Sequence, residues 1–116
     1  MKRVIIESPY GSKDEIIVIR NQIYLGRCIM DSLSRGEAPF ASHGFYTQYL
    51  DDNIPEERKL GIEAGFAWGK VTERVAVYHD YGITEGMRQG INQYLHKIFI
   101  AIEKELWITY RLIGKD

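Results

Sequence analysis

The sequence is poor in cysteine, with one residue, Cys28, among 116. A single thiol cannot form an internal disulfide, so no disulfide framework is expected. Cys28 falls inside an apolar helical pattern, where a buried structural thiol is the ordinary interpretation. A reducing compartment suits this cysteine usage, and we expect a cytoplasmic protein.

Long apolar runs and an excess of one charge are also absent. Only three consecutive apolar residues precede Glu7, far fewer than a signal peptide or a membrane span of about eighteen residues requires. Fifteen basic and sixteen acidic residues give a formal net charge of −1, which offers no electrostatic footprint for a phosphate backbone. We therefore expect a soluble protein whose partner is neither a membrane nor a nucleic-acid polymer.

Familiar metal and cofactor motifs are missing as well. The histidines at 43, 79 and 96 have no ligand spacing such as HExxH, and no second cysteine is present, so no metal site is expected. The sequence contains neither a GK[ST] phosphate loop nor a GxSxG nucleophile elbow. We expect no cofactor.

What the sequence does contain is an alternation of strand-like and helix-like segments. With 45% apolar residues, the chain is long enough for one core and too short for two, which predicts one domain over 1–116. The alternation predicts an α/β domain with a parallel sheet. The β-rich segments are 3–6, a short stretch from Pro39, 74–78 and 107–113, and the helical patterns run from Ser12 to Gly36, from Pro55 through 71, and from Thr84 to about Leu106.

The first helical pattern has clear signals at both ends. Ser12 is a candidate N-cap, and Gly36 can end the helix in a left-handed conformation. Apolar residues at positions 16, 19, 23, 30 and 33 have the spacing of an amphipathic helix. The later stretch GFYTQYLDDN is predicted to be an ordered, aromatic-rich loop.

The loops that follow the strands are the candidate ligand sites. In parallel α/β sheets, ligands bind at the carboxyl ends of the strands, near the point where the strand order reverses. This rule selects SPYG at 8–11, the region from His43 to Asp52, and HDYGITEG at 79–86. SPYG precedes a helix N-terminus and suits a phosphate or a carboxylate, although a plain strand-to-helix turn is an equal alternative.

HDYGITEG combines residue types that hold sugars and phosphates. Asp80 can accept hydrogen bonds from ribose hydroxyls, Gly82 can take a positive φ, and Thr84 can cap the next helix. Gly86 permits close approach of a ligand, whereas Glu85 places a negative charge in the first turn. A plain capped helix start is the alternative.

Two further positions carry candidate chemistry. His43 and Tyr46 can hydrogen-bond to a base or stack on it, unless these rings only close the core. Glu63 is either a solvated or ion-paired helix residue or, with Phe66 and Trp68 near it, a general acid with a raised pKa.

Together, the stretches IIESPY, SRGEAPFASH, PEER, GIEAGFAWG and YHDYGITEGM resemble a known family over residues 2 to 90. It is an uncharacterised family of small phage and bacterial proteins, distantly related to the nucleoside 2-deoxyribosyltransferase-like Rossmannoid group. The resemblance implies a flavodoxin-like or Rossmann-like three-layer sandwich with a mostly parallel four- or five-stranded sheet. It also implies a homo-oligomer with a nucleoside or nucleotide pocket.

The resemblance also bears on catalysis. Enzymes of the deoxyribosyltransferase group use a glutamate nucleophile at the start of the helix after their DxGT-type loop. Matching Gly82, Thr84 and Gly86 to that loop places Gly90 at the nucleophile position. Glu85 lies about a turn earlier, and Glu63 belongs to a different helix.

We therefore expect a protein that binds a nucleoside- or nucleotide-derived molecule. If the protein is phage-encoded, it would act in the host cytoplasm and could sequester a nucleotide immune signal. One alternative is an N-glycosidase or deoxyribosyltransferase that uses Glu63 or Glu85, and another is an interaction protein without a small ligand. The expected ligand-binding residues are Ser8, Pro9, Tyr10 and Gly11 for backbone or phosphate contact, His43 and Tyr46 for the base, and Asp80, Gly82, Thr84, Gly86 and Met87 for the sugar or phosphate.

Overall fold

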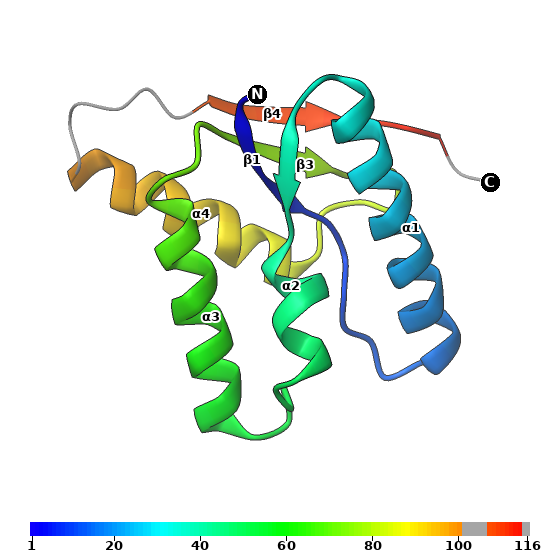
Figure 1. The fold of residues 1–116 in the computed structure, drawn as a ribbon. Helices are drawn as coiled ribbons and strands as arrows, with labels where there is room; N and C mark the ends of the chain where they lie inside the picture. The colour runs from blue at the N-terminus through cyan, green and yellow to red at the C-terminus, as the bar shows by residue number, and fades with distance from the viewer. Residues whose placement is uncertain (101–106, 115–116) are drawn as a thin grey trace.

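The fold is built on a four-stranded sheet in which every pairing is parallel (Figure 1). A computed structural model describes residues 1–100 and 107–114 of the chain. The strands are β1 (Arg3–Glu7), β2 (Ala38–Phe40), β3 (Arg74–Tyr78) and β4 (Trp107–Arg111), and they lie in the order β2-β1-β3-β4. The helices are α1 (Glu15–Ser34), α2 (Ser42–Phe45), the 3-10 turn η1 (Tyr46–Gln48), α3 (Pro55–Gly69) and α4 (Glu85–Ile100).

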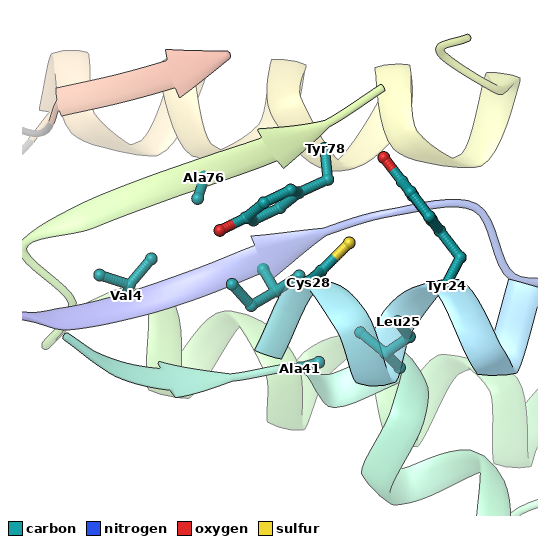
Figure 2. Close-up of a cluster of buried hydrophobic side chains, with 8 residues drawn as sticks. Val4, Tyr24, Leu25, Cys28, Ala41, Ala76 and Tyr78 are labelled. Carbon is teal, nitrogen blue, oxygen red and sulfur yellow. The ribbon is translucent and has the colours of Figure 1, made fainter. Parts of the chain in front are cut away.

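Side chains of the two central strands alternate between two buried faces. Val4 and Ile6 of β1, with Ala76 and Tyr78 of β3, pack against α1. Figure 2 shows Tyr24 and Cys28 of α1 reaching toward these strands, and Leu25 belongs to the same cluster. Cys28 is fully buried, as the sequence predicts.

The opposite face of the sheet packs against α4. Ile5, Val75 and Val77 form a second cluster with Met87, Ile91 and Tyr94, and Phe66 of α3 lies against it. Because both faces are covered, the strands are nearly continuous apolar runs rather than alternating ones. Helices on both sides of a parallel sheet confirm the expected three-layer α/β architecture (Figure 1).

Helix α1 differs from expectation at its start and in the face that it buries. Its N-cap is Asp14, whose side chain accepts a hydrogen bond from Ile16 N at 2.9 Å, and Ser12 instead accepts one from Asp14 N. The helix does end at a left-handed glycine, Gly36, with φ of 77°. The apolar positions 16, 19, 23, 30 and 33 form the exposed face, whereas the buried residues are Asn21, Tyr24, Leu25, Cys28 and Ser32.

Several element boundaries also differ from those expected. The stretch predicted as an aromatic loop forms α2 and η1, because Phe45 N and Leu50 N find carbonyl partners one helical turn back. Strand β2 begins at Ala38, one residue before Pro39. The predicted carboxyl end of the last helix, near Leu106, lies outside the described residues. Among the described helices, every one is too short or too polar to traverse a lipid bilayer.

A buried polar network ties α1 to the sheet on the face opposite α4. Arg111 of β4 donates two hydrogen bonds of 2.7 Å to the two carboxylate oxygens of Glu37, which also accepts hydrogen bonds from Ser32 Oγ and Arg74 Nη1. These hydrogen bonds, led by those from Arg111, outweigh burial and lower the pKa of Glu37 to about 2. Tyr78 OH joins the network by accepting from Arg111 and donating to Asp31.

Candidate binding pocket

The candidate site is a pocket at the carboxyl ends of the two central strands, where the strand order reverses. From β1 the chain crosses through α1 to β2, on one side of β1, whereas β3 lies on the other side. The carboxyl ends of β1 and β3 therefore form the topological switch point of this sheet. A cavity of about 540 Å³ opens there, lined by parts of 7–11, 42–52, 58–66 and 84–94.

Glu7, the last residue of β1, is the acidic group placed deepest in this arrangement. Strand alternation puts Glu7 on the same face as Ile5, toward α4, where it lines the cavity. Its carboxyl group lies against Gly90, since a β-carbon there would come within 2.8 Å of Glu7 Oε1. Among the described residues, none donates a hydrogen bond or forms an ion pair with this carboxyl group.

The burial of Glu7 without a partner determines its charge. Removing a carboxylate from water disfavours the ionised form, and burial raises the pKa of Glu7 to about 8. Tyr94 of α4, whose ring also lines the cavity, has its pKa raised by burial and by the nearby Glu7. At neutral pH, Glu7 is therefore mainly a neutral carboxylic acid, able both to donate and to accept a hydrogen bond.

Ser8 and His43 form a hydrogen-bonded pair across two loops. Ser8 directly follows β1, and His43 lies on α2. Their side chains meet with Ser8 Oγ 2.8 Å from His43 Nε2. Burial lowers the pKa of His43 to about 4, so the imidazole is neutral at physiological pH. Both residues line the cavity, where they supply hydrogen-bonding groups without net charge.

Aromatic rings form much of the remaining wall. Tyr10 contacts His43 edge-to-face with ring centroids 6.2 Å apart, and Phe66 contacts Tyr94 at 5.5 Å. The hydroxyl of Tyr46 accepts a hydrogen bond of 2.8 Å from Trp68 Nε1, which fixes the tyrosine ring against α3. An apolar wall with a few oriented polar groups is the usual composition of a small-molecule site.

Most of the residues expected from the sequence to bind ligand do line this cavity. Thr84 caps α4 as expected, because its Oγ1 accepts a hydrogen bond from Met87 N at 3.2 Å. The predicted residues that line the cavity are Ser8, Tyr10, Gly11, His43, Tyr46, Thr84, Gly86 and Met87.

Asp80, Gly82 and Pro9 are placed elsewhere. Asp80 lies on the α1 face, like Tyr78, because it continues the alternation of β3. Its carboxylate accepts hydrogen bonds from Tyr24 OH and from the backbone N–H groups of Ile113 and Gly114. Gly82 does adopt a positive φ of 85°, but it shapes the turn outside the cavity. The side chain of Pro9 is fully buried in the fold.

The two glutamates considered as nucleophiles are both exposed. Glu63 lies outside the cavity and faces Lys59 across a helical turn at 3.9 Å. Glu85 lies at the cavity mouth, where its carboxylate forms an ion pair of 3.0 Å with Arg88. Both carboxylates are therefore exposed, ion-paired groups of the helix surface.

The sequence did not single out Glu7, Arg58 or Tyr94 as site residues. Glu7 ends an apolar run, which indicates only where a strand ends. It lies two residues after Ile5, however, so strand alternation places its side chain on the α4 face. Arg58 is an exposed residue of α3 whose position at the cavity depends on how that helix packs. Within the described ranges 1–100 and 107–114, no group of three or more His, Cys, Asp or Glu side chains could hold a metal ion.

The fold and the pocket define a class of protein: an α/β domain with a parallel sheet and a small-molecule-sized cavity at its switch point. Residues 2–103 match the family described as "Domain of unknown function (DUF7768)", and the chain belongs to this family. No curated protein and no solved structure gives a significant match to the chain.

Proposed function

We propose that this protein binds a nucleoside or a nucleotide-derived small molecule in the switch-point pocket and does so without converting it. The observation that carries the proposal is the position of an aromatic-walled cavity of about 540 Å³ at the carboxyl ends of β1 and β3. Parallel sheets of this kind bind ligands at their switch points, and nucleotide-type cofactors are well-known examples. The volume lies within the range of about 300–1,000 Å³ typical of small-molecule sites.

The aromatic rings suit the base. Tyr10, Tyr46 and Tyr94 come from three different segments that line the cavity, so a flat heterocycle would find π-faces or ring edges on several sides. The neutral carboxyl group of Glu7 and the Ser8–His43 pair supply donors and acceptors for ring nitrogens and exocyclic groups.

The mouth of the cavity suits a sugar or a phosphate. The N-terminal turn of α4 supplies Thr84 and Gly86, and helix N-termini favour negative groups. Glu85 opposes an anion there, but its charge is offset by Arg88. The guanidinium of Arg58 lies on the facing helix, α3, and can add the positive charge that a phosphate requires.

Thermal unfolding with a panel of nucleosides and of nucleoside mono-, di- and triphosphates tests this proposal. A ligand at one hundred times its dissociation constant should add about 2.7 kcal/mol to the free energy of unfolding. Arg58→Ala should weaken binding of phosphorylated members more than of nucleosides. Lys59→Ala is the matched control, because Lys59 is the neighbouring exposed cation of α3 and does not line the cavity. Absence of stabilisation by any member of the panel would contradict the proposal.

A second function, N-glycosidic bond cleavage, is favoured by one observation. The carboxyl group of Glu7 occupies the space beside Gly90, the position at which the resemblance places a nucleophilic glutamate. A protonated Glu7 could give its proton to the departing base nitrogen while water adds to the anomeric carbon, and the proton released by that water would restore the acid. Release of free base from a nucleoside or nucleotide, lost in Glu7→Gln, would establish this activity. Recovery of the ligand unchanged would support binding alone.

A further inference from the structure

Helix α1 presents a continuous apolar stripe to the outside of the molecule. The residues Ile16, Ile19, Ile23, Gly26, Met30 and Leu33, here called the α1 seam, lie on the face turned away from the sheet. Ile16 is 77% exposed, Ile23 61% and Met30 66%. These large side chains contribute nothing to the core, since α1 packs on the sheet through the neighbouring face that carries Tyr24 and Cys28 (Figure 2).

The spacing within the α1 seam is regular. Successive members are separated by three, four, three, four and three residues, which is the a/d repeat of helices that pair side by side. A core-facing helix usually has an apolar stripe at least about 100° wide, whereas a strict a/d stripe is the narrower seam of a coiled coil. A 20-residue helix is about 30 Å long, so the seam offers almost three heptads to a partner helix.

The surface of the seam is self-complementary at its middle. Gly26 has no side chain, and a shallow recess over it is bordered by Ile23, Arg27, Met30, Asp31 and Ile113. Ile23 borders the recess on the amino-terminal side of Gly26 and is exposed. If a second α1 runs antiparallel about a two-fold axis between positions 24 and 25, Ile23 of each helix meets Gly26 of the other, and Ile19 meets Met30.

The charges at the ends of α1 favour the antiparallel direction. Asp14 and Glu15 outnumber Lys13 at its amino end, and Arg35, which also pairs with Asp31 at 2.8 Å, follows its carboxyl end. Antiparallel pairing brings the acidic end of each helix to Arg35 of the other, whereas parallel pairing brings like charges together. The same direction also opposes the two helix dipoles.

We propose that the α1 seam binds a second copy of this chain, through antiparallel pairing of the two α1 helices. The pairing covers the exposed isoleucines and leaves the switch-point pocket open, because α1 packs on the sheet face opposite the cavity-lining α4. The dimer therefore stands independently of the ligand proposed above.

Sedimentation equilibrium of the intact protein measures the association. Wild-type protein should be a dimer, and Ile19→Lys should shift it to a monomer with an unchanged far-ultraviolet spectrum. Leu60→Lys on α3 is the matched control, because Leu60 is 56% exposed and Ile19 55%. Each new lysine also lies four residues after a glutamate, Glu15 in α1 and Glu56 in α3. A wild-type monomer, or a dimer that survives Ile19→Lys, would overturn the proposal and leave the seam to a different partner.

Engineered disulfides test the direction of the helices. The double variant Ile19→Cys with Met30→Cys should form a covalent dimer on mild oxidation, and Ile19→Cys alone should not, because antiparallel pairing separates the two copies of position 19. The native Cys28 is fully buried and does not compete. Efficient crosslinking of the single Ile19→Cys variant would overturn the antiparallel arrangement.

Discussion

The carboxyl group of Glu7 lies against the backbone of Gly90, so closely that a β-carbon at position 90 would come within 2.8 Å of Glu7 Oε1. Glycine in the interior of a helix normally destabilises it by about 0.5–1 kcal/mol relative to alanine. The glycine at this position in α4 is explained by the space that the carboxyl group of Glu7 occupies, and the pair can be tested as a unit.

Gly90→Ala is expected to raise the free energy of unfolding by less than helix propensity alone would give, because the new methyl group has to displace the carboxyl end of Glu7. In a Glu7→Ala background, the same change should raise the free energy of unfolding by about 0.5–1 kcal/mol, as helix propensity alone dictates. Urea unfolding of the four proteins in this double-mutant cycle measures the coupling. Equal effects of Gly90→Ala in both backgrounds would show that the two residues do not interact.

The pH dependence of stability should report the buried acid at position 7. The pKa of Glu7 is about 8 in the folded protein against 4.5 for the unperturbed carboxyl group. As pH rises through this interval the unfolded chain gives up its proton while the folded protein keeps it, so stability falls by at most about 1.4 kcal/mol per pH unit. Glu7→Gln removes this slope. Unfolding curves at pH 5, 7 and 9 should therefore show the free energy of unfolding of Glu7→Gln increasing relative to that of wild type as pH rises. A constant difference between the two proteins would contradict the raised pKa.

The Glu37–Arg111 pair should produce the opposite trend in acid. Because the pKa of Glu37 is lowered to about 2, its contribution is complete above the ordinary value of 4.5 and is lost as pH falls from there toward 2. Arg111→Met should cost about 3–5 kcal/mol by leaving a buried carboxylate without its main partner. The double variant with Glu37→Leu should lose less than Arg111→Met alone. A larger loss in the double variant would mean that the pair itself, rather than the stranded charge, carries the effect.

Asp80 is expected to act on the fold rather than on a ligand. Although burial raises the pKa of Asp80, hydrogen bonds from Ile113 N, Tyr24 OH and Gly114 N outweigh it and lower the pKa overall. Asp80→Ala should destabilise the protein by about 1–3 kcal/mol, because these donors lose a charged, half-buried acceptor. Hydrogen exchange should show faster exchange of the Ile113 and Gly114 amides. Loss of ligand binding without loss of stability would contradict this structural role.

The order of elements and the position of the pocket followed from the sequence, but which face each side chain occupies was harder to read. The run at 74–78 is β-branched and bounded by polar residues, so β3 was predicted with its observed limits. Asp80 was expected in the site because it follows a strand. Asp80 lies two residues after Tyr78, so strand alternation directs it to the same face, toward α1. This alternation is visible in the sequence.

Helix α1 shows a limit of a different kind. Its largest aliphatic residues lie outside, and the sheet is covered by a mixed set of Asn21, Tyr24, Leu25, Cys28 and Ser32. Apolar spacing identifies a face that avoids water, whether that face meets the same chain or another one. The polar residues of the inner face are acceptable there only because distant partners satisfy them, such as Tyr10 O for Asn21 Nδ2 and Glu37 for Ser32.

The buried network around Glu37 also constrains when the protein can fold. Glu37 is neutralised chiefly by Arg111, a residue 74 positions further along the chain, on β4. Until that strand joins the sheet, the carboxylate has to remain in water, because a buried anion without a partner is strongly unfavourable. On the ribosome, the native packing of α1 on β1 and β2 therefore waits until β4 has emerged.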